Sequence, residues 1–204
     1  MGVQKITSAV PDIAGYHQAR GSWVENFPRG VQSFGVQAFK SYFEGNATHM
    51  NWTEITVSMV KSVTDTHPTP VKLGHWLRAM KVSNIDHIPK KNRAALMPHG
   101  EFLHGRGTRH MVRRSGLIQF DIDVKQNPQL NTEEIKRRAS AVPWIVMCAR
   151  SAGAGVWGLA LRQGCEDQQL TDIARRLGVV LDTANSRNVA ALRFAAYDPH
   201  PHIK

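Results

Sequence analysis

The stretch GLIQFDIDV, residues 116–124, alternates apolar and polar side chains. Successive side chains point to opposite faces of a β-strand, so one face of this strand would carry Ile118, Phe120 and Ile122 into a core. The other face would set Asp121 and Asp123 side by side. Like charges this close cost free energy unless they are neutralised, and a divalent cation is a common neutraliser of paired carboxylates. The stretch therefore predicts a buried strand with a candidate metal-binding carboxylate pair.

The residues after this strand predict two helices and three more strands. In NTEEIKRRAS, residues 131–140, Asn131 is a predicted helix N-cap, and Glu134 stands at the third helical position of a capping box. A second helix has a stripe of apolar residues and ends at Gly178. Further strands are expected at 144–149, 156–162 and 192–198.

Residues 116–198 thus run β-α-β-β-α-β, which is the order of a ferredoxin-like or RRM-like unit. The predicted fold class is α+β, with this unit as the core of a domain over residues 53–204. An added α/β element precedes the core, with a strand at 55–60 and a helix at 71–80. Residues 1–52 are interpreted as an N-terminal extension of unknown role.

The handedness of the predicted connections brings distant segments together. The end of the first strand, the turn SAGAG at 151–155, and Asp182 should meet at one edge of an open sheet face. Glycines allow a backbone to approach a ligand closely, and a glycine-rich turn beside carboxylates suits metal-bound phosphates. A plain turn aspartate is the alternative interpretation of Asp182.

The charge balance favours a polyanionic partner. The chain has 26 Lys and Arg against 16 Asp and Glu, a formal net charge of +10. Between residues 90 and 114 the only acidic residue is Glu101. The basic residues predicted to contact nucleic acid there are Lys90, Lys91, Arg93, Arg106, Arg109, Arg113 and Arg114.

Other features indicate a cytoplasmic protein. No run of eighteen apolar residues exists, so no membrane span or membrane partner is expected, and the N-terminus lacks the layout of a signal peptide. Cys148 and Cys165 are too few for a disulfide framework, and Cys148 lies in an apolar run that predicts a core position. The closing DPHPHIK is expected to be a frayed tail.

The ordered motifs resemble the catalytic core of the archaeo-eukaryotic primase superfamily, which includes the primase-polymerases. That core has a DxD strand, a small-residue turn, and a hydrophobic-Asp step before an Arg-containing strand. The corresponding segments are FDID (120–123), SAGAGVW (151–157), and LD (181–182) before LRFAAYDP (192–199). MPHGEFLHGRG and RRSGLIQFDID are similar to the VirE N-terminal-like domains of mobile-element and phage replication proteins. This likeness covers about residues 55–204.

The resemblance implies a metal-dependent nucleotidyltransferase, a DNA primase or polymerase, acting in the replication of a mobile element or phage. It implies that the catalytic and metal-binding residues, holding Mg²⁺ or Mn²⁺, are Asp121, Asp123 and Asp182. The implied nucleotide-binding residues are Ser151, Gly153, Gly155, Trp157 and Arg193. The implied partners are a single-stranded DNA template and nucleoside triphosphates. Because larger family members continue into a helicase-like region, a replicative helicase would come from another chain or from a C-terminal region beyond this sequence.

One departure from the family pattern makes a second, non-catalytic function an alternative. Trp157 stands where the superfamily most often has a His that holds the triphosphate, and Trp supplies no charge. Trp157 either stacks on a base, worth about 1–3 kcal/mol, or fills the sheet as a half-buried aromatic. Arg193 either reaches a phosphate or pairs with Asp198 at the surface. The alternative function is a catalytically degenerate single-stranded DNA or origin-binding module.

Overall fold

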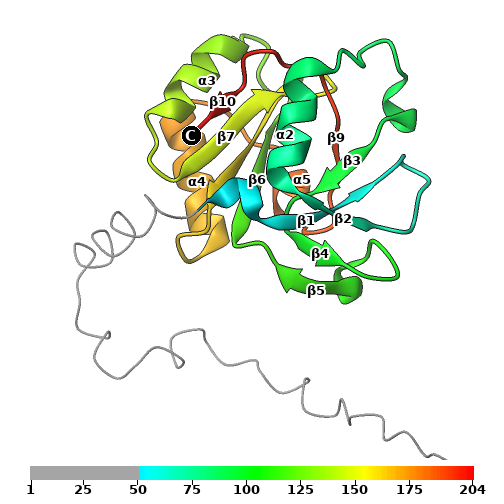
Figure 1. Ribbon diagram of the computed structural model, residues 1–204. Helices are drawn as coiled ribbons and strands as arrows, with labels where there is room; N and C mark the ends of the chain where they lie inside the picture. Colours follow the sequence, from blue (N-terminus) through cyan, green and yellow to red (C-terminus); the bar gives the residue numbers. More distant parts are fainter. Residues whose placement is uncertain (1–50) are drawn as a thin grey trace, which may run out of the picture. The chain divides into compact units, whose positions relative to one another are not determined.

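The computed structural model describes residues 51–204, and the chain divides into two units between residues 50 and 51. The predicted extension, residues 1–52, lies outside the described residues except for its last two. The described unit is α+β, with two four-stranded antiparallel sheets, a two-stranded ribbon and several helices (Figure 1). The α+β class predicted from the sequence is therefore confirmed.

The first sheet has the strand order β2-β1-β3-β9, and all neighbours are antiparallel. Its strands are β1 (Thr56–Val60), β2 (Thr69–Lys72), β3 (Ala95–Met97) and β9 (Arg193–Phe194). Strand β1 and the helix α2 (Leu73–Val82) confirm the added α/β element. Strand β2 lies between the predicted strand and helix of this element and runs into the start of the predicted helix, and β3 lies within the basic segment; neither strand was predicted.

The second sheet has the strand order β10-β7-β8-β6 and carries the strand from which the prediction started. Its strands are β6 (Leu117–Ile122), β7 (Ile145–Arg150), β8 (Val156–Leu161) and β10 (His202–Ile203). The helix α3 (Thr132–Ser140) connects β6 to β7, and α4 (Glu166–Leu177) follows β8. The predicted strands and helices of this region are confirmed, apart from shifts of one or two residues at their ends.

Both faces of the second sheet are covered, which corrects the predicted open face. On one face, Ile118, Phe120 and Ile122 pack in a core cluster with residues of α3 and α4, as predicted. On the other face, α2 and the first sheet pack against β6, β7 and β8 (Figure 1). Leu117 and Gln119 are consequently buried, and Asp121 is the one residue of β6 that is partly exposed.

The last strand of the predicted β-α-β-β-α-β order belongs to the other sheet. A strand was expected at 192–198, but β9 has two residues and pairs with β3. The free edge of β6 is covered instead by the short helix α5 (Thr183–Arg187). There the backbone N–H of Asp121 donates to Ser186 Oγ (3.1 Å). Covering an edge strand in this way satisfies its backbone groups and blocks pairing with another chain.

The basic segment forms a hairpin and short helical turns. Strands β4 (Gly100–Phe102) and β5 (Met111–Arg114) pair antiparallel, and the 3₁₀ turn η3 (Thr108–His110) lies in the loop between them. Another 3₁₀ turn, η2 (Lys90–Asn92), precedes β3, and η1 (Trp52–Glu54) opens the described region.

The helix ends follow the sequence signals closely. Asn131 Oδ1 accepts a hydrogen bond from the N–H of Glu134 (3.1 Å), which confirms the predicted N-cap. The carboxylate of Glu134 does not complete the capping box, because it pairs with Arg137 and Arg138. Gly178 ends α4 with φ 67°, in the left-handed region that favours glycine.

The C-terminal segment is ordered, which corrects the expected frayed tail. Strand β10 pairs with β7, and Lys204 Nζ donates to the carbonyl of Val142 (2.6 Å). Cys148 is buried, as predicted, and burial raises the pKa of its thiol to about 12. Within residues 51–204 no helix is both long enough and apolar enough to cross a bilayer. A cytoplasmic location stays a prediction.

Candidate functional site

A cavity of about 140 Å³ lies at the end of β6, and five separate segments of the chain line it. We call it the carboxylate cavity. Its lining includes every residue predicted to be catalytic or nucleotide-binding: Asp121, Asp123, Ser151, Gly153, Gly155, Trp157, Asp182 and Arg193. The cavity is also lined by Lys90, Asn185, Leu192 and Phe194. The fold thus brings together residues that the sequence separates by more than seventy positions.

Asp121 is neutralised by Arg193 within the protein. Arg193 Nη1 lies 2.7 Å from Asp121 Oδ2, and the two side chains are 7% and 17% exposed. The guanidinium also donates to Gln119 Oε1 (2.7 Å) and to the carbonyl of Asn185 (3.2 Å). The alternative pairing of Arg193 with Asp198 is wrong, because Asp198 pairs with Lys136. Arg193 therefore orients Asp121, and its guanidinium is largely committed to protein groups.

Asp182 has a local structural role at the start of α5. Its Oδ1 accepts from the N–H of Asn185 (3.1 Å), and its Oδ2 accepts from Asn185 Nδ2 (2.7 Å). An Asp at the N-cap satisfies backbone donors that a helix leaves unpaired at its first turn. Its own N–H donates to the carbonyl of Asp121 (2.8 Å), which fixes α5 beside β6. Both carboxylate oxygens of Asp182 are thus engaged.

The carboxylates offer two candidate cation ligands rather than three. Asp123 Oδ1 accepts from the N–H of Lys125 (2.9 Å), and Asp121 uses Oδ2 for Arg193. Within the described region, neither the second oxygen of Asp121 nor that of Asp123 has a hydrogen-bond donor. No three His, Cys, Asp or Glu side chains of residues 51–204 are grouped so that they could hold a metal ion. Magnesium is often held by one or two carboxylates together with substrate phosphates and water, so Asp121 and Asp123 fit that pattern and Asp182 does not.

The electrostatic balance of the carboxylate cavity favours a cation over a bare anion. Three carboxylates, those of Asp121, Asp123 and Asp182, face two cationic side chains, those of Arg193 and Lys90. Most of this charge is partly buried, so solvent screens it less than surface charge. A free triphosphate would be repelled here unless a divalent cation accompanied it.

The SAGAG turn approaches the end of β6, and its two glycines have different surroundings. A Cβ on Gly155 would lie 2.3 Å from the carbonyl oxygen of Ile122, so this glycine allows two backbones to meet. Beside Gly153 the nearest heavy atom to such a Cβ is Ser151 Oγ, at 3.9 Å. The left-handed conformation of the turn falls on Ala154, with φ 66°. Gly153, which is exposed, is therefore the glycine with room for a ligand.

Alanine substitutions should separate these two roles. We expect Gly155→Ala to lower the free energy of unfolding by about 1–3 kcal/mol, because a backbone oxygen must move. Gly153→Ala should change it by less than about 0.5 kcal/mol. Urea unfolding of the two variants beside the wild type measures both. Equal destabilisation by the two substitutions would contradict this assignment.

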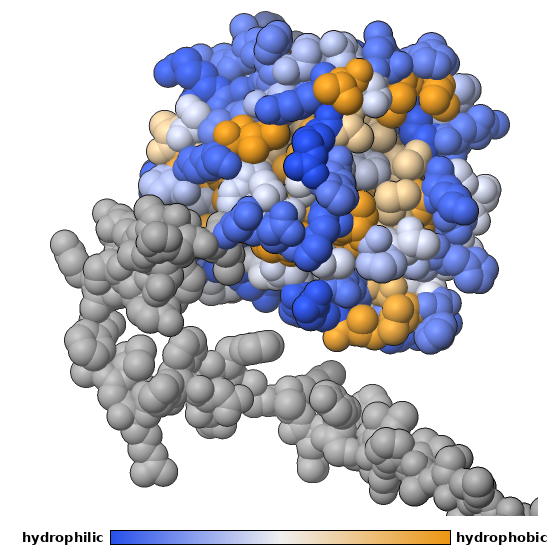
Figure 2. Space-filling view, in the orientation of Figure 1, coloured by the Kyte–Doolittle hydropathy of each residue, from blue (hydrophilic) through white to orange (hydrophobic). Residues whose placement is uncertain are grey.

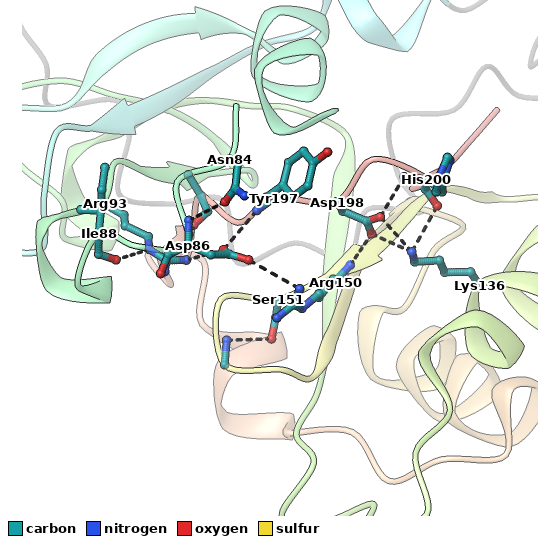
Figure 3. A network of polar contacts seen from close by, with 12 residues as sticks. Asn84, Asp86, Ile88, Arg93, Lys136, Arg150, Ser151, Tyr197, Asp198 and His200 are labelled. Carbon is teal, nitrogen blue, oxygen red and sulfur yellow. Dashed lines mark hydrogen bonds and ion pairs between the residues drawn. The ribbon is translucent and has the colours of Figure 1, made fainter. Parts of the chain in front are cut away.

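A polar network fixes the strand that leads into the turn (Figure 3). The N–H of Arg150, the last residue of β7, donates to Asp198 Oδ2 (2.8 Å), and the same oxygen lies 2.8 Å from Lys136 Nζ. The guanidinium of Arg150 reaches Asp86 (3.5 Å). Because Ser151 follows directly, this network sets where the turn begins.

Trp157 lies in the core rather than on the surface. It is 2% exposed and packs in the cluster shared by α2 and the two sheets. It also lines the carboxylate cavity and stands opposite Asp121 in the pairing of β6 with β8. The structure favours the space-filling interpretation, even more deeply buried than expected, over a free stacking platform.

Six of the seven predicted nucleic-acid-binding residues are exposed or half-buried, and the seventh, Arg93, is buried. Lys90 and Lys91 are exposed on η2, and Arg109, Arg113 and Arg114 are exposed on the hairpin, with Arg106 half-buried in its loop. The face in Figure 2 is mostly hydrophilic, with small separate apolar patches. Arg93 corrects the prediction: it is 7% exposed, and its guanidinium donates to Asp86 and to the carbonyls of Ile88 and Ala195. That guanidinium holds loops together and does not face a partner.

His99 is a buried titratable group close to this site. It is 2% exposed, and neither ring nitrogen has a hydrogen-bond partner among residues 51–204. Burial, reinforced by the charges of Arg193 and Arg114, lowers the pKa of His99 from 6.5 to about 4. The imidazole is therefore neutral at physiological pH.

This lowered pKa predicts a loss of stability in acid. The unfolded chain binds a proton at His99 near pH 6.5, whereas the folded chain binds it only near pH 4. The free energy of unfolding should thus fall as pH drops below 6.5 and level off below 4, by an amount on the order of 3 kcal/mol from this group. Urea unfolding at a series of pH values between 4 and 6.5 gives the free energy of unfolding as a function of pH. This dependence on pH should be weaker for His99→Gln than for the wild type. His75→Gln, at an exposed position, should match the wild-type slope, and parallel slopes for all three proteins would contradict the account.

The sequence did not predict that Asn185 and Phe194 line the carboxylate cavity, nor the structural roles of Gln119 and Asp182. Gln119, which lies behind the cavity, lies on the same face of β6 as Asp121, so the alternation of the strand could have identified it. Asp182 could have been recognised as an N-cap, because Asp before a short polar helix is a common start signal. Asn185 and Phe194 carry no local signal of their position.

Comparisons with models of protein families, with curated proteins and with solved structures find no match to this chain.

Proposed function

We propose that this domain is a metal-dependent nucleotidyltransferase of the primase-polymerase type. The observation that carries the proposal is that Asp121, Asp123 and the turn at 151–155 converge on one cavity. The strand order β7-β8-β6, with α3 between β6 and β7, supports a ferredoxin-like core, and the displaced β9 departs from it. The formal charge of +10 supports a nucleic acid as partner.

In the proposed reaction, the 3′-hydroxyl oxygen of a primer or first nucleotide attacks the α-phosphorus of a nucleoside triphosphate, and pyrophosphate leaves. Asp121 and Asp123 would hold Mg²⁺ or Mn²⁺, which when bound neutralises charge on the triphosphate and on the oxygens of the displacement. Arg193 holds Asp121 in place through its ion pair. Gly153 gives the substrate phosphates room beside the turn, and Lys90 adds a positive charge at the same cavity.

A non-catalytic single-stranded DNA or origin-binding module is the second candidate, and specific observations favour it. Arg193 already neutralises Asp121, Asp182 is committed to α5, and Trp157 leaves no charge at the position of the usual His. On this alternative the basic surface would persist without a nucleotide site. A helicase partner stays a prediction under both functions.

Calorimetric titration with a nucleoside triphosphate separates the two candidates. The nucleotidyltransferase should bind the nucleotide with Mg²⁺ or Mn²⁺ present and lose that binding in a chelator. A folded, DNA-binding protein that binds no nucleotide in either condition would identify the binding module.

A further inference from the structure

A second hollow adjoins the carboxylate cavity and extends toward the basic hairpin. This groove has a volume of about 530 Å³, within the ~300–1,000 Å³ common for ligand sites, whereas the carboxylate cavity is smaller. Both are lined by Lys90, Asp121, Arg193 and Phe194. At its other end the groove is lined by Arg106 and Gly107 of the hairpin loop. A ligand in the groove would thus lie between the hairpin and the carboxylates.

The aromatic surface of this groove is Phe194. Phe194 is partly buried and packs against the cluster of Val60, Ala95, Met97 and Phe102, so the fold holds its ring in place. Lys90 Nζ lies 5.3 Å from the centroid of that ring. A cation over an aromatic face is attracted to it, but the attraction is small for an exposed lysine.

We propose that the groove binds single-stranded nucleic acid, with one base stacked on Phe194 and a neighbouring phosphate held by Lys90. This inference rests on the proposed function, since it places the strand beside the carboxylates where nucleotides would be joined. The base takes the position over the ring that Lys90 holds in the free protein. Lys90, which is exposed on η2, moves its ammonium to the phosphate, exchanging one favourable contact for another.

The charge along the groove favours a strand over an isolated nucleoside. Arg106 lines the groove and its Nη1 donates to the carbonyl of Val63 (2.7 Å), and Arg109 and Arg114, outside the lining, are exposed on the same hairpin. A basic track with an aromatic platform is the usual construction of sites that bind single strands without sequence preference.

Fluorescence anisotropy with labelled oligothymidylate, without metal or nucleotide, tests the inference over a series of salt concentrations. Phe194→Leu should weaken binding about 10-fold while leaving the slope of log K against log salt unchanged, because it removes stacking and no charge. Phe194→Tyr should bind like the wild type. Lys90→Gln should make the salt slope shallower by about 0.7, whereas the matched control Lys81→Gln, exposed on α2, should change neither affinity nor slope.

The inference and the proposed function fail in different ways. Wild-type affinity in folded Phe194→Leu would overturn the groove assignment even if the protein synthesises DNA. Equal effects of Lys90→Gln and Lys81→Gln would overturn it too, because binding would then depend on net charge alone. If Phe194→Leu weakened nucleoside triphosphate binding and not oligonucleotide binding, the groove would be a nucleotide site, which contradicts the proposal. If the wild type and its variants bind oligothymidylate as expected but the wild type synthesises no DNA or RNA, only the proposed catalytic function would be overturned.

Discussion

Asp123→Asn is expected to abolish metal-dependent nucleotide binding and to reduce nucleotide addition by at least about 100-fold. The amide keeps an oxygen that can accept the hydrogen bond from the N–H of Lys125, so the local backbone is retained. It removes the negative charge that would hold the cation. Binding of single-stranded DNA should be unchanged or tighter, because the cavity becomes less negative. Calorimetry, primer extension and anisotropy on one preparation measure all three.

Asp123 is a better test position than Asp121 because of the ion pair with Arg193. Removing the charge of Asp121 would leave a buried guanidinium unpaired, so lost activity could reflect lost structure. A matched control is Asp172→Asn, which removes one carboxylate charge from the outer surface of α4, where Asp172 pairs with Arg175 and Arg176. Asp172→Asn should retain activity. Full activity in Asp123→Asn, or a collapse of DNA binding in it, would contradict the division of roles.

Lys136→Met is expected to lower the free energy of unfolding by about 3–5 kcal/mol, since it leaves the carboxylate of Asp198 buried and without its cation. Lys136 and Asp198 are 6% and 3% exposed, and Nζ lies 2.8 Å from Oδ2. Burial alone would lower the pKa of Lys136, but its hydrogen bonds to Asp198 and Glu133 outweigh burial and raise it. Urea unfolding measures the loss.

Two further variants separate the contribution of the buried Lys136–Asp198 ion pair to stability from that of exposed charges. Arg137→Met removes an exposed ion pair from the same helix and should cost less than about 1 kcal/mol. The double variant Lys136→Met, Asp198→Asn should be less destabilised than the sum of its parts, because it leaves no unpaired charge. A loss below about 1 kcal/mol for Lys136→Met would contradict a structural role for the network that precedes the turn.

The sequence predicted those parts of the site that depend on local pattern. The alternation in GLIQFDIDV gave the strand, its core face, and the position of Asp121 and Asp123 at one end. The order of elements then brought the SAGAG turn to the same place. Asn131 and Gly178 fixed the ends of α3 and α4, because capping depends on neighbouring residues.

The remaining features depend on long-range contacts that no local pattern records. The ion pair of Asp121 with Arg193 joins residues far apart in the chain, and Arg193 reaches it because β9 pairs with β3. The open face was wrong because α2 and the first sheet supply a second apolar layer over β6. Strands β3, β4 and β5 are three or four residues long and lie in a basic segment, so their sequence carries little strand signal.

Primer extension and de novo synthesis on single-stranded DNA, with Mn²⁺ and mixed nucleotides, test the central claim most directly. The wild type should make products that depend on the template and on the metal, and Asp123→Asn should make none. A folded wild type that binds single-stranded DNA but makes no product would contradict the claim, and the domain would then be a binding module.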